Sequence, residues 1–544
     1  MKKTHSASWA MKLTAGLLGL GLVLSGCART GDDENTDGTG GNGGNTETTE
    51  SRFRNGIIGE QDAPGEPTEG GTLNFAAYSE ARSLDPVKTI NTGSTGGTEM
   101  SAIYDVLLRH NSETLEYEPW LAESFDTEDD QTYVLTLREG VTFSDGTPLN
   151  ADAVVWSINR YVEGRGGQTA VWLLAVEKFE ATGDLEVTFT LTRPWDGFGY
   201  LLATAPGMIV AESSVGEGED FTPIGAGPFT LEKYAPQEEL ILARRDDYWN
   251  GTPPLEKLRF FTITSESGRF ETMTSGQTDV AYIREPDVVV DALDAGYPGF
   301  MEVSSLGRLL LVNHREEANT SDVRIRQAMA MALDPQLVAD QEFDGEGMPT
   351  TAMFPEESEW TLDTEPLPYD QEEARKLVEE AKADGHPGTV RFLGVANAGE
   401  ELGLSLKAQW EAVGLDVEIQ NAQSVSDLVQ SIYVTGDFDT VVWSFGVPDG
   451  GVLPEMYESF HSQGGGPNAY ADEEMDALVI ELMEAGDRDA QKEVLEKIQQ
   501  RYNDTVPSIS LGATPEYVTW QDNVHGIVPS VDSVVLLGEA FKAE

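Results

Sequence analysis

The hydrophobic residues of this chain recur with two different spacings, and the spacing changes from one stretch to the next. Strict alternation of apolar and polar residues, which is typical of half-buried strands, occurs at 72–76, 133–137 and 187–191. Apolar residues spaced as on one face of a helix occur at 151–161. Asn150 directly precedes that stretch and can cap a helix with its side-chain oxygen. This pattern predicts an α+β arrangement for the first half of the chain.

Strands and helices alternate more regularly in the second half. Helical spacing recurs at 374–381, 402–410 and 475–482, and strand-like stretches lie between the helices at 390–393 and 417–419. Asp370 and Glu373 are spaced as a capping box ahead of the first of these helices. The second half is therefore predicted to be α/β, and the whole chain to be of the α/β class in a mixed α+β form.

The N-terminal 26 residues are typical of a secretory signal peptide. Lysines precede an apolar run from Leu13 to Leu24, which is too short to cross a bilayer comfortably. The run leads into Leu24-Ser25-Gly26-Cys27, and Cys27 is the only cysteine of the chain. This arrangement closely resembles the lipobox of bacterial lipoproteins, which implies a lipidated Cys27 and an exported protein held at the outer face of the cell membrane.

Residues 28–70 are rich in Gly, Thr, Asn and acidic residues. Their low apolar content predicts a flexible acidic tether, with the lipidated Cys27 at its start and the ordered chain beginning near Gly71.

Charge narrows the possible partners. The chain carries 35 Lys and Arg against 95 Asp and Glu, a formal net charge of −60, and the acids are spread along its whole length. Such a surface repels phosphate backbones, so nucleic-acid binding is excluded. It also repels anionic lipid, so the lipid anchor is the predicted attachment to the membrane.

The dispersed acidity predicts a stability that rises with salt, because ions screen the repulsion between like surface charges. We expect the melting temperature of the protein to increase as salt is raised from a low to a molar concentration. A melting temperature that stays flat over this range would contradict the prediction.

No arrangement of residues in the sequence indicates catalysis. The six histidines have no spacing suited to zinc ligation, and no Gly-x-Ser-x-Gly elbow is present. We predict a protein that is not an enzyme and that has no cofactor, no metal site and no catalytic residues. Carboxylates are so abundant that composition alone leaves a secreted carboxylate-dependent glycosidase open.

Several sequence blocks occur in the order found in one known family. They resemble bacterial extracellular solute-binding proteins of family 5, the peptide, nickel and oligopeptide-binding subunits of ABC importers. The strongest block runs from Pro119 to Leu149 and includes the turn Phe143-Ser144-Asp145-Gly146-Thr147-Pro148. Other matching blocks are Ser83–Pro86, Gly225–Phe229, Ser321–Ala328, Tyr369–Ala381, Gly436–Asp439 and Tyr470–Leu478.

The resemblance implies a two-lobed, periplasmic-binding-protein-like "flytrap" fold in which the lobes close on a ligand by a hinge motion. It implies a discontinuous lobe I formed by 71–85, 206–308 and 506–544, an extra subdomain at 86–205, and lobe II at 309–505. It further implies a monomer that delivers peptides to the permease subunits of an importer, whose separate ATPase drives uptake.

The resemblance also suggests ligand-binding residues. In peptide-binding relatives, a Trp-x-x-Asp segment follows Gly-x-Phe-Asp, and its aspartate holds the free α-amino group of the peptide. Alignment on Gly436–Asp439 places Phe445 at the aromatic position and Pro448 at the aspartate position, with Asp449 one residue later. Either a shift of one residue lets Asp449 bind the amine, or the site does not bind a free amine.

Three further residues complete the candidate set. Alternation along the strand leads us to expect Phe445 on the cleft side and Trp443 in a core, although both are candidates for ligand contact. Tyr78 follows the first strand and Asn313 lies on the segment between the lobes, where family members often contact ligand.

Other functions stay open at this stage. A protein of the same fold could instead bind an oligosaccharide, an opine-like compound or a metal chelate. Pro448 stands where peptide-binding relatives have their amine-binding aspartate, and this difference leaves the alternative open. A sensor or adhesin without a transporter is a further possibility.

Overall fold

One mixed β-sheet runs through most of the described chain, which comprises residues 52–59, 67–218, 220–395 and 400–543 of the computed structural model. The signal peptide, Cys27 and most of the predicted tether lie outside these residues. The sheet contains the strands β15 (Asp416–Ala422), β14 (Thr389–Val395), β16 (Thr440–Trp443), β13 (Gly299–Val312), β17 (Ser508–Trp520), β12 (Val280–Ile283), β2 (Thr72–Ala77), β11 (Lys257–Thr262), β10 (Glu239–Arg244) and β9 (Phe229–Ala235), in that spatial order.

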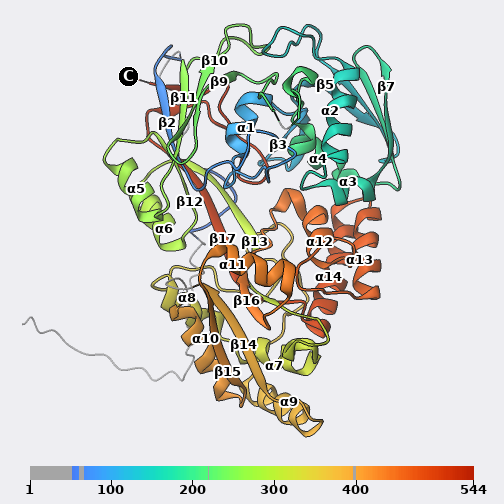
Figure 1. Cartoon of the computed structure of the whole chain (residues 1–544), viewed down its shortest axis with the longest axis vertical. Coiled ribbons are helices and arrows are strands. Elements are labelled where there is room, and N and C mark those ends of the chain that lie inside the picture. The colour runs from blue at the N-terminus through green and yellow to red at the C-terminus, as the bar shows by residue number, and fades with distance from the viewer. Residues whose placement is uncertain (1–51, 60–66, 219, 396–399, 544) are drawn as a thin grey trace, which may run out of the picture. The chain divides into compact units, whose positions relative to one another are not determined.

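Two long antiparallel strands, β13 and β17, connect the two halves of this sheet (Figure 1). Residues 299–304 of β13 lie in the half that contains β12 and β2, whereas residues 309–312 pair with β16 in the other half. Between these segments the register shifts between Ser304 and Arg308 and again between Arg308 and Leu309. Leu306 has a positive φ of 49°, so the strand is irregular where it passes from one half to the other.

These irregularities mark the place where two lobes meet, as expected for a periplasmic-binding-protein-like fold. Gly512 lies opposite them on β17, where an added Cβ would come within 2.4 Å of the Met348 carbonyl oxygen. The lobe boundaries proposed above stay a prediction.

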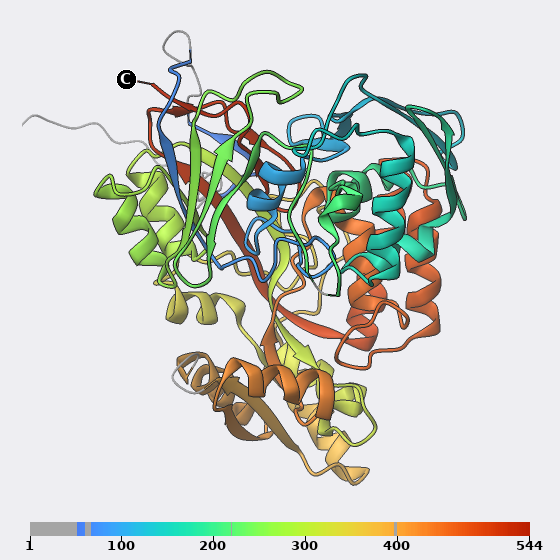
Figure 2. The ribbon, with the colours of Figure 1, turned by 45° about the horizontal axis from the view of Figure 1, so that its top comes forward.

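The helices cover the sheet and build the peripheral layers (Figures 1 and 2). They are α1 (Gly97–Tyr104), α2 (Ala151–Glu163), α3 (Thr169–Ala175), α4 (Gly199–Ala203), α5 (Glu266–Thr274), α6 (Pro286–Asp294), α7 (Val323–Ala332), α8 (Pro335–Glu342), α9 (Gln371–Ala383), α10 (Glu400–Ala412), α11 (Val425–Gln430), α12 (Val452–Phe460), α13 (Glu473–Glu484) and α14 (Arg488–Thr505). None of the helices in the described ranges is long and apolar enough to cross a membrane.

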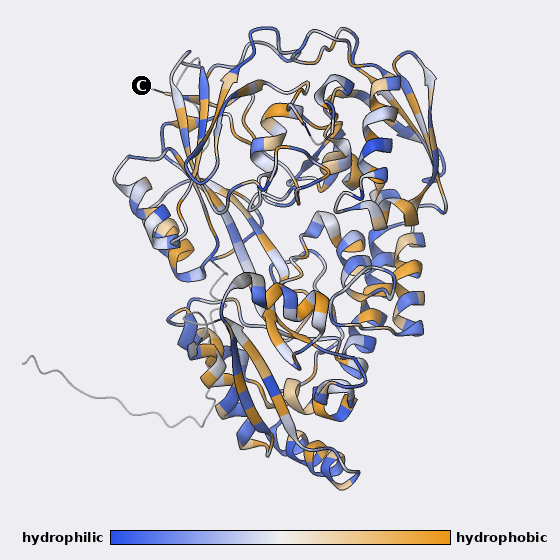
Figure 3. Cartoon of the chain, in the orientation of Figure 1, coloured by the Kyte–Doolittle hydropathy of each residue, from blue (hydrophilic) through white to orange (hydrophobic). Residues whose placement is uncertain are grey.

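The local sequence signals correspond to elements of the structure. The Asn150 side chain accepts a 2.9 Å hydrogen bond from the Ala153 N–H at the start of α2. Asp370 caps α9 in the same way, at 3.0 Å from both the Glu372 and the Glu373 N–H. Figure 3 shows hydrophobic and hydrophilic residues interleaved along the strands and helices, which is the pattern from which these elements were predicted.

A separate four-stranded antiparallel sheet lies within the segment 86–205. Its strands are β5 (Ala122–Thr127), β6 (Thr132–Leu137), β8 (Glu186–Leu191) and β7 (Val176–Gly183), in that spatial order, and a hairpin of β3 (Leu108–Asn111) and β4 (Glu116–Pro119) precedes them. Phe198 is fully buried in its core, with its ring centroid 5.3 Å from those of Tyr133 and Phe189. The Gln491 amide of α14 donates a 2.9 Å hydrogen bond to Asp196, so this subdomain contacts the second half of the chain.

The structure differs from the sequence prediction at residues 52–59. The composition of 28–70 predicts a tether that ends near Gly71, but Gly56–Ile58 form strand β1, which pairs with β13. Phe53 is only 7% exposed. The average composition of the stretch conceals the apolar residues at 53, 57 and 58, which offset the cost of ordering this short segment.

Candidate functional site

Two adjoining cavities lie where β13 and β17 pass between the halves of the sheet. The larger, here called the main cavity, has a volume of about 810 Å³ and is lined by residues that include Tyr78, Arg308 and Leu402. The smaller, here called the acidic chamber, has a volume of about 370 Å³. The two share Arg284, Trp443 and Ser444 as lining residues, so they form one cleft.

Tyr78 is held at one wall of the main cavity by cationic side chains. It follows β2, and its half-buried ring lies 5.0 Å from the guanidinium carbon of Arg269 and 5.5 Å from that of Arg284. Arg269 is fully buried and donates a 2.7 Å hydrogen bond to the Tyr282 carbonyl. These contacts fix the orientation of the Tyr78 ring, which leaves a flat aromatic surface on the cavity.

Both aromatic residues after Gly436–Asp439 line the cleft. Trp443, at the end of β16, lines both cavities, and Phe445 lines the acidic chamber and packs edge-on to Phe460 at 5.4 Å. The expectation that Trp443 would face a core was wrong. Residues two positions apart on an extended strand share a face, so Trp443 and Phe445 face the same side.

The main cavity presents charges of both signs. Arg284 and Arg308 line it together with carboxylates that include Glu266, Glu285 and Asp287. Arg308 is paired with Glu342 at 2.5 Å, whereas the ion pair of Arg284 with Glu516 is long, at 3.9 Å. Arg284 is therefore the cation better placed to pair with a negative group of a ligand.

The acidic chamber collects five carboxylates from four parts of the chain. They are Glu302 of β13, Glu455 and Glu458 of α12, Glu516 of β17 and Asp532. Burial raises the pKa of Asp532 and of Glu458 to about 7. The pKa values of Glu302 and Glu455 are raised well above the usual range of a glutamate, mainly by burial and to a smaller extent by the neighbouring negative charges.

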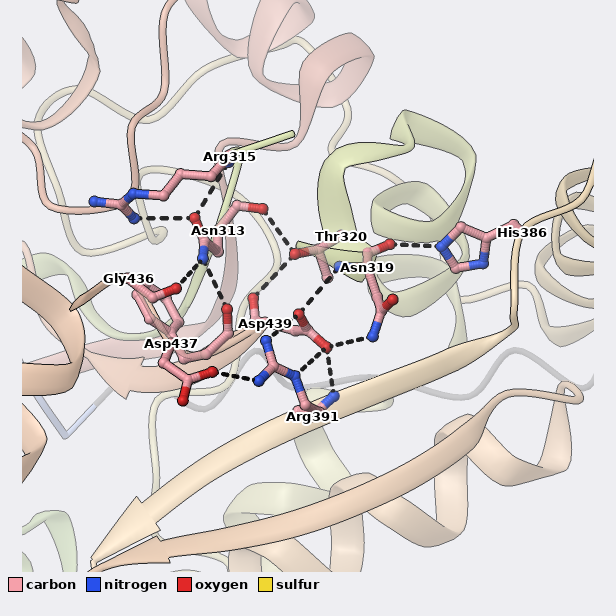
Figure 4. Close-up of polar contacts among 10 residues, drawn as sticks. Asn313, Arg315, Asn319, Thr320, His386, Arg391, Gly436, Asp437 and Asp439 are labelled. Atoms are coloured by element: carbon pink, nitrogen blue, oxygen red, sulfur yellow. Dashed lines mark hydrogen bonds and ion pairs between the residues drawn. The ribbon is translucent and has the colours of Figure 1, made fainter. Parts of the chain in front are cut away.

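The structure does not bring Asn313 to the cleft cavities. Asn313 is 1% exposed, and its amide donates to the carbonyls of Gly436 at 3.0 Å and Phe438 at 2.7 Å (Figure 4). Its side-chain oxygen accepts a 3.0 Å hydrogen bond from Arg315. These bonds fix the segment that follows β13 against the loop before β16, which is a structural task close to the place where the lobes meet.

Asp449 lies in a third cavity, of about 390 Å³, between the subdomain and α12–α14. Its carboxylate accepts hydrogen bonds from Asn55 at 2.8 Å, from Ser358 at 2.6 Å and from the Glu359 N–H at 3.1 Å. Both of its oxygens are therefore used by the chain itself, and burial raises its pKa.

Replacement of Asp449 by alanine is expected to change stability rather than ligand preference. The half-buried Asn55 and the buried Ser358 would lose the acceptor of their hydrogen bonds, which costs about 1–3 kcal/mol of unfolding free energy. Denaturant unfolding and binding of free and N-acetylated peptides would be measured on the same variant. If sensitivity to acetylation disappears with Asp449→Ala while stability is kept, Asp449 is the amine ligand after all.

Sequence reasoning missed Arg284 and the chamber carboxylates. Arg284 directly follows β12, belongs to no recognisable motif, and reaches the cleft because β12 pairs with β17. The chain contains 95 Asp and Glu residues, and no local sequence pattern distinguishes the five chamber carboxylates from the others. Only the tertiary arrangement of β13, β17, α12 and the turn at Asp532 brings them together.

Comparisons with known proteins agree with this architecture. The sequence model of bacterial extracellular solute-binding proteins, family 5 Middle, matches residues 116–467. The oligopeptide-binding protein AppA of Bacillus subtilis is 25% identical over 513 residues, which cover 85% of this chain and 90% of AppA.

Solved structures match over most of the chain. DppA of Helicobacter pylori, in complex with the peptide STSA, superposes with a TM-score of 0.73 at 21% identity and covers 88% of this chain and 99% of its own. NikA of Brucella suis, in complex with Fe(III)-EDTA, has a TM-score of 0.69 at 21% identity and covers 87% and 100%. Similar folds therefore hold chemically different ligands.

Proposed function

Because this chain belongs to the bacterial extracellular solute-binding proteins of family 5, we propose that it captures peptides in the cleft formed by the main cavity and the acidic chamber. The captured peptide is then delivered to the permease of an ABC importer, and the protein itself carries out no chemistry. Membership of the family already makes the chain the substrate-binding component of an ABC importer of peptide or nickel-type ligands, and the proposal narrows the ligand to peptides.

The observation that carries the proposal is the position of the cleft. The main cavity is lined by Tyr78 and Arg284 from one half of the sheet and by Leu402 and Val442 from the other. A ligand that contacts both halves stabilises their closed arrangement, because it binds that arrangement more tightly than the open one. Closure then produces a surface by which a permease can distinguish the loaded protein from the empty one.

The lining favours a peptide over a sugar or a metal chelate. Tyr78, Phe343 and Trp443 supply aromatic surface, and Arg284 lies among carboxylates, so groups of both charges can be paired. Zwitterionic peptides offer such groups together with backbone hydrogen bonds. The relatives point in the same direction, since AppA is described as oligopeptide-binding and DppA was solved with a peptide. A chelate, as in NikA, is the second candidate.

Thermal stabilisation by defined ligands tests the proposal. The mature chain carrying Cys27→Ser would be melted in high salt with free peptides, the same peptides N-acetylated, oligosaccharides and nickel chelates. A ligand at a hundredfold excess over its dissociation constant is expected to add about 2.7 kcal/mol of stability. Stabilisation by peptides supports the proposal, whereas stabilisation by sugars or chelates alone overturns it.

We further propose that Cys27 carries the lipid that holds the protein at the outer face of the membrane. In cells fed a labelled fatty acid, the wild-type chain is expected to become labelled and to sediment with membranes. Cys27→Ser is expected to remain unlabelled, because it lacks the thiol that takes the lipid. Label on the Cys27→Ser chain would contradict the assignment.

A further inference from the structure

The carboxylates of the acidic chamber are placed where their mutual repulsion is high. Glu302 and Glu516 are direct cross-strand partners on β13 and β17, and like charges in such positions destabilise a sheet. The Ser533 hydroxyl lies 2.9 Å from a carboxylate oxygen of each, and one hydroxyl hydrogen can serve only one of them at a time. The Tyr282 hydroxyl also donates a 2.6 Å hydrogen bond to Glu516, but neither hydroxyl carries a charge, and Arg284 lies 3.9 Å from Glu516. Among the described residues, the two acids therefore share one distant cationic partner.

Asp532 is directed into the same chamber by a strained turn. Asp532 and Ser533 both have positive φ values, 60° and 56°, which non-glycine residues seldom adopt in succession. The Gly93 N–H binds the Asp532 carbonyl at 2.7 Å, and the Tyr200 hydroxyl donates to the Asp532 carboxylate at 3.1 Å. A strained backbone conformation, which costs free energy, therefore holds the Asp532 carboxylate, only 9% exposed, beside other acids.

Helix α12 adds two more acids to the chamber. Glu455 and Glu458 are three residues apart and so lie on one face of the helix. The Oε1 atom of Glu458 is buried and has no hydrogen-bond partner among the described residues. Leaving a buried carboxylate oxygen unpartnered is costly, which indicates that its partner comes from outside the chain.

Adaptation of the surface to salt does not account for this cluster. Acids that serve solubility are solvated, whereas Glu302 is 8% exposed and lines a cavity. Among the described residues that line the chamber, Arg284 is the one cationic side chain, and its distance of 3.9 Å from Glu516 is long for an ion pair. Three tyrosines interact with these acids: Tyr200 and Tyr117 with Asp532, and Tyr282 with Glu516. Burial raises the pKa of each tyrosine well above its usual range, so all three are neutral.

The entrance to the chamber suits a long side chain. Trp443 lies at the junction with the main cavity, and Phe445 and Tyr433 line the chamber beyond it. Aromatic walls pack against an aliphatic or guanidinium-bearing stem, while carboxylates pair with its charged end. Ring faces and carboxylates together are the surroundings that a desolvated organic cation prefers.

Resting on the proposed function, we infer that the acidic chamber binds a basic side chain of the peptide, so that the protein prefers peptides that contain arginine or lysine. The peptide main chain lies in the main cavity, and the cationic side chain passes Trp443 to pair with Glu302, Glu458 and Asp532. Each cation placed there supplies the positive charge that the cluster lacks.

Pairs of peptides that differ only in charge test this inference. Tetrapeptides with arginine at each position in turn would be compared, by calorimetry on the mature Cys27→Ser chain in high salt, with peptides carrying neutral citrulline at the same position. At one position at least, citrulline is expected to bind about tenfold to a hundredfold more weakly, as for a lost hydrogen bond to a charged group. Equal affinities at every position would overturn the inference while leaving peptide capture intact, and absence of binding by any peptide would overturn both.

A matched pair of variants assigns the effect to the chamber. Glu458→Gln is expected to reduce the preference for arginine over citrulline, whereas Glu99→Gln is expected to preserve it. Glu99 is also buried, and burial raises its pKa to about 7, but it lies on α1 outside the chamber. An unchanged preference in Glu458→Gln and in Glu302→Gln would count against the inference.

The dependence on pH gives a second readout. As the pH rises from 6 to 8, Asp532 and Glu458 lose protons and the chamber becomes more negative. The ratio of arginine-peptide to citrulline-peptide affinity is therefore expected to grow over this range. A ratio that stays constant or falls would contradict pairing with these carboxylates.

Discussion

Replacement of Asp439 by alanine is expected to destabilise the half of the molecule that contains β14 and β16 by about 3–5 kcal/mol, the cost of breaking a buried charge pair. Asp439 is fully buried, and its carboxylate accepts hydrogen bonds from the Arg391 N–H at 2.8 Å and from the Asn319 N–H at 3.1 Å (Figure 4). The Arg391 guanidinium is also within 3.1 Å of it. The variant would leave these donors without an acceptor.

Denaturant unfolding measures this loss, and Asp437→Ala is the matched control. Asp437 pairs with the same arginine at 2.5 Å, but its side chain is 70% exposed, so its removal is expected to cost about 1 kcal/mol or less. Equal losses of unfolding free energy in the two variants would show that burial of Asp439 is not what makes the network important.

Replacement of Trp443 by alanine is expected to weaken peptide binding by about 2 kcal/mol or more, roughly thirtyfold, as for an aromatic residue at the centre of a binding surface. Trp443 is half-buried and lines both the main cavity and the acidic chamber. The unfolding free energy is expected to change less than the affinity, because the indole ring borders the cleft.

Calorimetric titration with one bound peptide measures the effect of Trp443→Ala. Trp443→Phe is expected to keep part of the affinity, because the smaller ring still offers an aromatic face. Tyr369→Ala, which removes a 52% exposed aromatic residue that lines neither part of the cleft, is expected to bind as the wild type does. If Trp443→Ala binds the peptide with wild-type affinity, the ligand does not bind in this part of the cleft.

The sequence predicted those elements whose signals are local. Asn150 and Asp370 mark the starts of α2 and α9 because their side chains act on N–H groups two or three residues away. Strand β13 was harder to predict, since its middle carries Glu302, Ser304 and Ser305 and its residues are buried on both faces. Alternation is absent from such a strand. Its irregular Leu306 lies where the pairing with β17 shifts, and its carbonyl accepts a hydrogen bond from the Phe445 N–H, which is far away in sequence.

Only part of the candidate site could be predicted from the sequence. The motif at Gly436–Asp439 led to Trp443 and Phe445, which line the cleft. The same motif led to Asp449, whose oxygens are taken up by Asn55 and Ser358. Asn55 is far away in sequence, so no local pattern could reveal that this carboxylate already has partners. The chamber acids are recognisable only by burial, which sequence composition does not report.

Closure of the two lobes on a peptide is the most direct test of the account. Cys27 is the only cysteine, so the mature Cys27→Ser chain can be labelled at two introduced cysteines, Glu271→Cys on α5 and Glu372→Cys on α9. Both positions are exposed and lie outside the cleft. Energy transfer between the two dyes is expected to change when an arginine-containing peptide is added and to follow its binding curve. A bound peptide that leaves the transfer unchanged, or a change produced only by sugars or chelates, would contradict capture of peptides between the lobes.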